Sequence, residues 1–283
     1  MIILTSGCID FLSPDIYDVD VPYSKPSGAR ICLVNYKNAT DPTWDELVSF
    51  LEVDDTDENL YINDSFVCGD FAEMLHNNAE KSGIKASWVA ISFADRDPHA
   101  LNAFNTTDRG LVYVDCTRAD IDDDRDGEGC SQDKIGYLVL GKEYATISID
   151  KAASMDYDFY EVYKMSWENL KKDYQAYNKD VDEHNEAVEL YNRSLLNHQE
   201  AIEIFERELR GRTIISDLDE YKRLSKMQLE LIAQGEEILA QQEEINSQKD
   251  KLDEILSEIS ERQDELGCHF KPLGIVEDIE IYW

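Results

Sequence analysis

The chain has 283 residues and a formal net charge of -34, from 61 acidic and 27 basic side chains. A surface this acidic repels nucleic acid and anionic membranes, so neither is expected as a partner. The sequence contains no P-loop, no G-x-G-x-x-G pattern after a strand and no H-E-x-x-H motif. Nucleotide-dependent and zinc-protease functions therefore lack their characteristic residues.

The first ten residues read MIILTSGCID, a short apolar stretch followed by small residues and Cys8. This order resembles the end of a lipoprotein signal with Cys8 as the lipidated residue, which predicts an exported, cell-surface or extracellular protein with a lipid anchor. The apolar part is far too short for such a signal, so this interpretation requires a start further upstream. No apolar run in the chain approaches the ~18 residues that a membrane span needs. The alternative is a first β-strand with an ordinary cysteine, in a cytoplasmic protein.

A cysteine, a histidine and an aspartate follow one another further along the chain. Cys68 opens the segment CGDFAEMLHNNAE, whose apolar residues recur at helical spacing. Residues 85–93 and 111–115 are typical of strands, and a turn at 105–110 separates His99 from Asp115. We therefore expect Cys68 at a helix N-terminus, where the helix dipole lowers the thiol pKa. We expect His99 and Asp115 on neighbouring strands that face this helix end.

These three residues predict a catalytic triad with Cys68 as the nucleophile, His99 as the general base and Asp115 as the residue that orients His99. Taken singly, each has a structural explanation, as a buried thiol or as a turn residue. The backbone N–H of Cys68 would hold part of the oxyanion, and Tyr61 and Asn63 are the candidates for a side-chain donor.

The Cys68 segment and the stretch HALNAFNTTDRGLVYVDCT together resemble the transglutaminase-like branch of the papain-type thiol enzymes, in its archaeal and bacterial members. The resemblance covers roughly residues 40–145. It implies a core of that fold, the triad roles given above, and attack on a protein or peptide amide through an acyl-enzyme. The superfamily includes cross-linkers, peptidases, amidases and inactive members, so hydrolysis and acyl transfer both stay open.

An acidic loop follows Asp115 and has the spacing D-x-D-x-D-G. In a calcium loop of this pattern, alternate carboxylates converge on one ion and the glycine makes the sharp turn. The predicted Ca²⁺ ligands are Asp122, Asp124, Asp126, Glu128 and Asp133. Gly129 stands where calcium loops carry an apolar residue, and a solvated acidic insertion is the alternative. No cofactor is expected for catalysis itself.

Two cysteines, Cys116 and Cys130, bracket the acidic loop. Their positions predict a disulfide that closes the loop in an oxidising compartment. The alternative is a set of reduced thiols in a cytoplasmic protein.

Beyond residue 155 the sequence changes to a seven-residue repeat. One column of the repeat contains Tyr160, Trp167, Tyr174, Val181, Val188, Leu195, Ile202 and Leu209, and a second contains Leu224, Leu231, Ile238, Ile245, Leu252, Ile259 and Leu266. Repeats of this length predict a coiled coil, and a break at Gly211 folds the two helices back antiparallel. Ser216 and Asp219 resemble a capping box for the second helix. His184 and His198 fall within the seam.

The predicted fold class is therefore α+β: a transglutaminase-like (papain-type) globular domain at residues 1–154, an antiparallel coiled-coil hairpin at 155–266, and a C-terminal return strand at 267–283 that packs on the globular domain. The predicted function is a cysteine enzyme that acts on protein or peptide amide bonds by hydrolysis or acyl transfer. The alternative is a non-catalytic surface scaffold whose coiled-coil arm binds protein partners.

Overall fold

A computed structural model describes residues 15–94, 96–117, 133–267 and 272–283. The structure is mixed α+β and contains a long helical hairpin, as the sequence predicts. It divides into two compact units. We call the first the sheet unit, which comprises the described residues up to Trp167 and those of Leu266–Trp283, and the second the arm, Glu168–Glu265. Within the described ranges no helix is long and apolar enough to cross a membrane.

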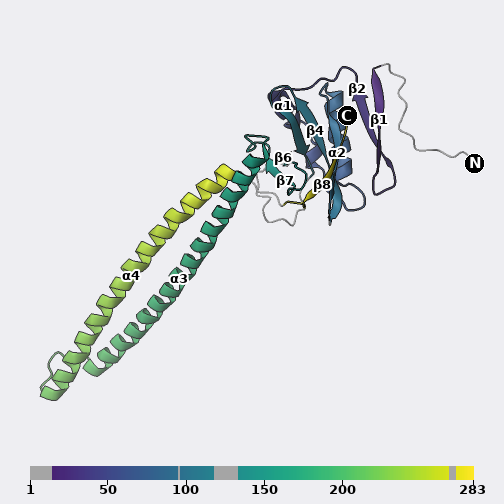
Figure 1. Ribbon diagram of the computed structural model, residues 1–283. Helices are drawn as coiled ribbons and strands as arrows, with labels where there is room; N and C mark the ends of the chain where they lie inside the picture. The colour runs from purple at the N-terminus through teal and green to yellow at the C-terminus, as the bar shows by residue number, and fades with distance from the viewer. Residues whose placement is uncertain (1–14, 95, 118–132, 268–271) are drawn as a thin grey trace, which may run out of the picture. The chain divides into compact units, whose positions relative to one another are not determined.

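An antiparallel sheet of six strands forms the centre of the sheet unit (Figure 1). The strands, in spatial order, are β7 (Ala145–Ser148), β6 (Lys134–Tyr137), β5 (Gly110–Asp115), β4 (Arg96–Thr106), β3 (Ser87–Phe93) and β8 (Val276–Tyr282). The predicted C-terminal strand is thus confirmed: β8 pairs antiparallel with β3. The sheet therefore combines five strands that precede the helical hairpin in the chain with one strand that follows it.

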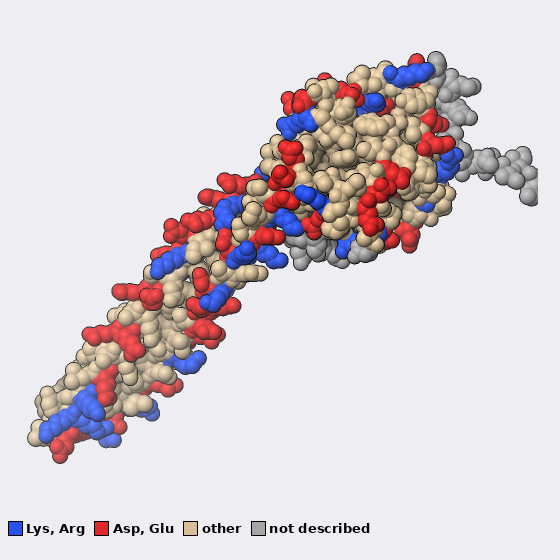
Figure 2. All heavy atoms as spheres, viewed as in Figure 1, with Lys and Arg blue, Asp and Glu red and all other residues tan. Residues whose placement is uncertain are grey.

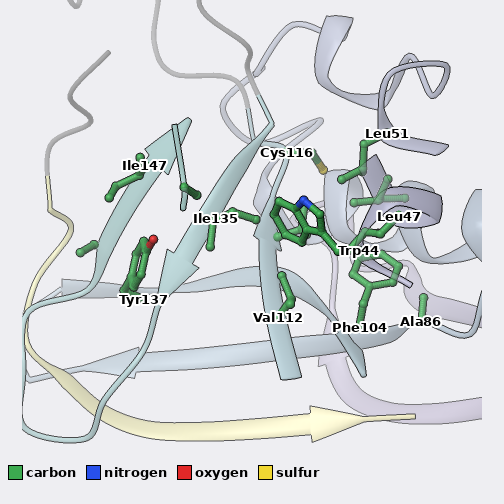
Figure 3. Packing of buried hydrophobic residues seen from close by; sticks show 14 of the residues in the cluster. Trp44, Leu47, Leu51, Ala86, Phe104, Val112, Cys116, Ile135, Tyr137 and Ile147 are labelled. Atoms are coloured by element: carbon green, nitrogen blue, oxygen red, sulfur yellow. The ribbon is translucent and has the colours of Figure 1, made fainter. Parts of the chain in front are cut away.

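Two helices pack against this sheet, and each follows from its local sequence. In α1 (Trp44–Leu51), Thr43 and Glu46 form a capping box, and Trp44, Leu47 and Leu51 are buried. In α2 (Cys68–Lys81), the apolar residues recur at helical spacing and are buried. Figure 3 shows the side chains of α1 facing Ile135, Tyr137 and Val112 of the strands, all in one core cluster. A short 3₁₀ helix (Thr56–Glu58) lies between α1 and α2.

A separate hairpin of β1 (Ile16–Ser24) and β2 (Arg30–Tyr36) is fixed to α2 by polar contacts. The Asn77 side chain accepts a 2.8 Å hydrogen bond from the backbone of Val34. Lys25 forms ion pairs with Asp70 at 3.1 Å and Glu73 at 3.0 Å, in the first turns of α2. These contacts hold the hairpin beside the helix end that carries Cys68.

The helical hairpin consists of α3 (Tyr157–Leu209) and α4 (Leu218–Leu266), which run antiparallel and side by side (Figure 1). Arg262 pairs with Asp173 at one end of the arm, and Arg223 pairs with Glu208 at the other. The buried residues of α4 all come from the predicted second column: Leu224, Ile238, Leu252 and Ile259.

Two details of the hairpin differ from the sequence prediction. Asp217 caps α4, because its carboxylate accepts a 2.8 Å hydrogen bond from the backbone of Glu220; Ser216 and Asp219 do not form the predicted capping box. The first turns of α3 belong to the sheet unit, since Tyr160 and Tyr163 are buried in its core cluster. Along the chain, the first compact unit therefore ends at Trp167, whereas the sequence predicted a boundary at 154.

Candidate active site

Three elements of the sheet unit bring Cys68, His99 and Asp115 together. Cys68 is the first residue of α2, His99 lies on β4 and Asp115 ends β5. Helix α2 is fixed on β4 by the Asn102 side chain, which donates a 2.8 Å hydrogen bond to the carbonyl of Ala72. Asn102 of β4 also pairs with Val114 of β5, and this register places Asp115 opposite Leu101. Because Leu101 is two positions from His99 along β4, His99 and Asp115 lie on the same face of the sheet.

The carboxylate of Asp115 is held by three donors. His99 Nε2 lies 2.8 Å from Oδ2, and the Tyr144 hydroxyl donates to the same oxygen at 2.6 Å. The backbone N–H of Thr117 donates to Oδ1 at 2.9 Å. Because Nε2 of His99 is engaged in this way, Nδ1 is left for the Cys68 thiol, which is hydrogen-bonded to His99. The three residues therefore form a hydrogen-bonded chain from thiol to imidazole to carboxylate.

Burial and charge act in opposite directions on this chain. Burial alone raises the pKa of the Cys68 thiol. The charge of His99, its hydrogen bond and the backbone N–H of Ala100 together lower this pKa by a larger amount, so the net pKa is below its ordinary value. Burial also disfavours the imidazolium of His99, yet Asp115 and Cys68 together raise the pKa of His99 to about 10. For Asp115 burial is again outweighed, by His99 and Lys134, and the pKa is lowered. The arrangement stabilises the thiolate–imidazolium form of the pair relative to the neutral thiol and imidazole.

Such a pair has the chemistry of an activated nucleophile. A thiolate at a helix N-terminus is stabilised by the dipole and attacks carbonyl carbon readily. The imidazolium beside it can donate its proton to a leaving group, and Asp115 fixes the ring in the tautomer that this requires. The structure thus places the three sequence-predicted residues together, on the predicted helix end and neighbouring strands.

The predicted oxyanion donors occupy the approach to α2. Tyr61 stacks at 6.4 Å on Phe71, one turn along α2 from Cys68. Asn63 lies in an exposed turn between Ile62 and Phe66. The backbone N–H of Cys68 belongs to the first turn of α2, whose N–H groups have no partner within the helix. The donor role of Tyr61 and Asn63 stays a prediction.

Two residues of the site carry no sequence signal. Tyr144 immediately precedes β7, is 2% exposed and lies 5.6 Å from the His99 ring, centroid to centroid. Lys134 is buried on β6 opposite Asp115 and donates a 2.6 Å hydrogen bond to the Thr117 carbonyl. Both reach the site through strand pairing, and the sequence offers no spacing that would reveal either.

The predicted calcium loop falls largely outside the described residues, which exclude Asp122, Asp124, Asp126 and Glu128. Asp133, the last predicted ligand, is buried directly before β6, and burial together with the charges of Asp57 and Asp54 raises its pKa to about 8. Among the residues that the structure covers, no cluster of three or more ligating side chains is present. The calcium site stays a prediction.

The cysteines differ from the prediction. Cys116 is a free thiol, fully buried against the core, and burial raises its pKa well above the ordinary value. The predicted disulfide between Cys116 and Cys130 is therefore wrong: Cys116 points into the apolar core, where it packs as a small hydrophobic side chain. Cys32 of β2 is the described cysteine that is disulfide-bonded. Cys8 and Cys130 lie outside the described residues.

Comparisons of this chain with protein-family models, with curated proteins and with solved structures find no match. The case for a function therefore rests on the geometry of Cys68, His99 and Asp115.

Proposed function

We propose that this protein is a cysteine enzyme of the transglutaminase-like type that cleaves or transfers protein or peptide amide groups through a Cys68 acyl-enzyme. One observation carries the proposal: the partly buried thiol–imidazole–carboxylate chain of Cys68, His99 and Asp115, with the thiol at the N-terminus of α2. Separate elements supply the three groups, and the structural explanations of each residue alone do not require them to meet.

The chemistry follows from the protonation states. The Cys68 thiolate attacks the amide carbonyl carbon, and the carbon–sulfur bond forms as the oxygen becomes an oxyanion. The imidazolium of His99 then gives its proton to the leaving nitrogen as the carbon–nitrogen bond breaks. Water or an amine attacks the thioester, His99 accepts the proton of that nucleophile, and the Cys68 thiolate leaves. Asp115 holds the ring throughout as a carboxylate and does not take up a proton.

The surroundings of Cys68 add a second argument. Cys68 packs against a cluster that includes Val21, Ile31, Trp88 and Ala100. An apolar wall limits the access of water to the thiolate, which strengthens its interaction with His99. Part of this wall comes from the β1–β2 hairpin, which Lys25 fixes to α2.

The first test is the pH dependence of alkylation. Iodoacetamide should modify Cys68 well below the pH at which ordinary thiols react, because its pKa is lowered by His99. Cys116 is the matched control within the same chain, since its pKa is raised and it is buried. His99→Gln should move the reaction of Cys68 to higher pH. Equal reactivity of Cys68 in the two proteins would overturn the proposal.

The second test is direct. The wild-type protein and Cys68→Ala should be profiled against peptide libraries with and without an added primary amine. Products that require Cys68 and appear without amine identify a hydrolase, and products that incorporate the amine identify an acyl transferase. A wild-type protein that matches Cys68→Ala in every reaction would leave the non-catalytic scaffold as the function.

A further inference from the structure

The helix α4 carries a second row of apolar side chains that α3 does not cover. Its members are 52–67% exposed: Leu218, Tyr221, Leu229, Ile232 and Leu239. At 100° per residue they lie on one face of the helix, about a third of a turn from the seam residues Leu224 and Ile238. We call this row, over Leu218–Leu239, the outer stripe.

The outer stripe is confined to one end of the helix. From residue 240 to 265 of α4, Leu256 is the large hydrophobic residue that is exposed, and only to 37%. The seam buries its own column over the full length of the helix, so the outer stripe is not needed for the pairing of α3 with α4. Contiguous exposed apolar side chains of this kind mark an interaction surface.

The charges along the outer stripe are arranged symmetrically around Leu229. Lys222 stands seven residues before Leu229, and Glu236 stands seven residues after it. If a second α4 packs antiparallel with its two-fold axis near Leu229, Lys222 of each copy lies beside Glu236 of the other. Leu218 of each copy then lies beside Leu239 of the other. A surface that is complementary to itself in this way is what a two-fold dimer requires.

The charge distribution of the chain favours this part of the surface for contact between two copies. At -34, two copies repel each other over most of their surface. Figure 2 shows acidic and basic side chains interspersed along the arm, with basic ones gathered at the end of the hairpin where α3 passes into α4. The basic residues of this end include Arg207, Arg210, Arg212, Lys222, Arg223 and Lys226. The outer stripe starts in this region, where charge opposes association least.

We propose that the outer stripe is a self-association surface, on which α4 of one molecule packs antiparallel against α4 of a second copy. The stripe spans 22 residues, or ~33 Å of helix, so its apolar side chains can pack in successive layers along the contact. The proposal concerns the arm and stands independently of the activity of Cys68.

A charge exchange tests the proposal in the full-length chain by sedimentation velocity over a concentration series. Lys222→Glu alone and Glu236→Lys alone should each weaken the dimer about tenfold or more, because each places like charges together twice across the two-fold axis. The double variant should restore the dimer. The two residues are 14 positions apart on one helix, ~21 Å, so they cannot pair within a molecule, and recovery can come only from contact between copies.

Leu229→Glu at the centre of the stripe should abolish the dimer, whereas Leu190→Glu is the matched control, since Leu190 is a comparably exposed leucine (56%) on α3 outside the stripe. Circular dichroism checks that each variant keeps its helices. A wild-type protein that stays at 32.5 kDa at every concentration overturns the proposal, and the stripe is then left to a different partner. A dimer that survives Leu229→Glu, or that the double charge exchange does not restore, overturns it as well.

Discussion

The sheet unit and the arm bury their side chains to very different extents. Six of the seven residues of β3 are buried, whereas four of the 49 residues of α4 are. Because hydrophobic stabilisation scales with the apolar area removed from water, the sheet unit gains far more per residue than the arm. A catalytic site needs side chains that a packed core holds in place, and the candidate triad lies in the unit that has such a core. The candidate interface lies on the arm, most of whose residues are at the surface.

Buried polar atoms have partners at the candidate triad, but both units also contain buried polar atoms without one, such as the ring nitrogens of His76 in the sheet unit. At the triad each oxygen of Asp115 has a donor. In the seam of the arm, Gln241 Oε1, Gln248 Oε1 and His184 Nδ1 are buried without a hydrogen-bond partner. Unpaired polar atoms cost stability, so the middle of the arm is weaker than its length suggests.

The largest expected effect is the loss of unfolding free energy when a core side chain of the sheet unit is truncated. Phe71 is fully buried in α2 and packs on Phe66 at 4.7 Å. Phe71→Ala should lower the unfolding free energy of the sheet unit by ~3–5 kcal/mol, because it leaves a cavity in a close-packed core. Urea unfolding followed by tryptophan fluorescence measures this, since Trp44 and Trp88 are both in the core.

Leu252→Ala is the matched truncation in the arm, where the side chain remains 8% exposed. It should lower the opening free energy of α4, measured by hydrogen exchange of its amides, by about 2 kcal/mol. The fluorescence transition should stay at the same urea concentration. If it shifted the fluorescence transition as far as Phe71→Ala does, the two units would unfold as one.

The second prediction concerns acid stability. His76 is fully buried in α2, neither ring nitrogen has a hydrogen-bond partner, and burial lowers its pKa to about 4. The unfolded chain therefore binds a proton that the folded sheet unit does not as the pH falls from about 6.5 to 4. The unfolding free energy of the sheet unit should therefore fall by about 3 kcal/mol as the pH is lowered from about 6.5 to 4.

His76→Leu should flatten this part of the pH profile, as measured by urea unfolding at a series of pH values. His198→Gln in the arm is the control and should leave the profile unchanged. A wild-type slope that persists in His76→Leu would assign the acid sensitivity to other groups.

The third prediction compares two buried phenols of the sheet unit. Tyr144 donates to the charged carboxylate of Asp115, and Tyr137 donates at 2.6 Å to the neutral carbonyl of Ser154. Tyr144→Phe should lower the unfolding free energy by ~1.5–3 kcal/mol and Tyr137→Phe should lower it by ~0.5–1.5 kcal/mol, as measured by urea unfolding. The difference arises because hydrogen bonds to charged groups are stronger. Removing the donor also raises the pKa of Asp115.

Only Tyr144→Phe should change the pH dependence of Cys68 alkylation, since only Tyr144 contacts the triad. Identical alkylation profiles for the two variants would show that the Tyr144 hydroxyl has no influence on His99.

The smallest expected effect is a gain in the arm. Gln248→Leu removes a buried amide oxygen without a partner and should stabilise α4 by about 1 kcal/mol. Hydrogen exchange of the α4 amides measures it, and Gln242→Leu, at an exposed position of the same helix, is the control. A loss of protection in Gln248→Leu would mean that the amide makes a needed contact.

The sequence by itself determined those parts of the protein that repeat or follow one another at short range. The seven-residue columns determine α3, α4 and the turn at Gly211, where φ is +68°. The order of Cys68, His99 and Asp115 was predictive because a helix start and two neighbouring strands are local features, and one antiparallel strand pair joins the last two.

The tertiary structure alone decided the contacts that join distant segments. Tyr144 and Lys134 reach Asp115 through the pairing of β5, β6 and β7, and neither has a motif. Cys116 is a core thiol because it directly follows the buried end of β5, although its spacing to Cys130 suggested a bridge. Periodicity and caps record the short-range energies of helices and turns, whereas which strands lie side by side depends on burying apolar area between residues far apart in the chain.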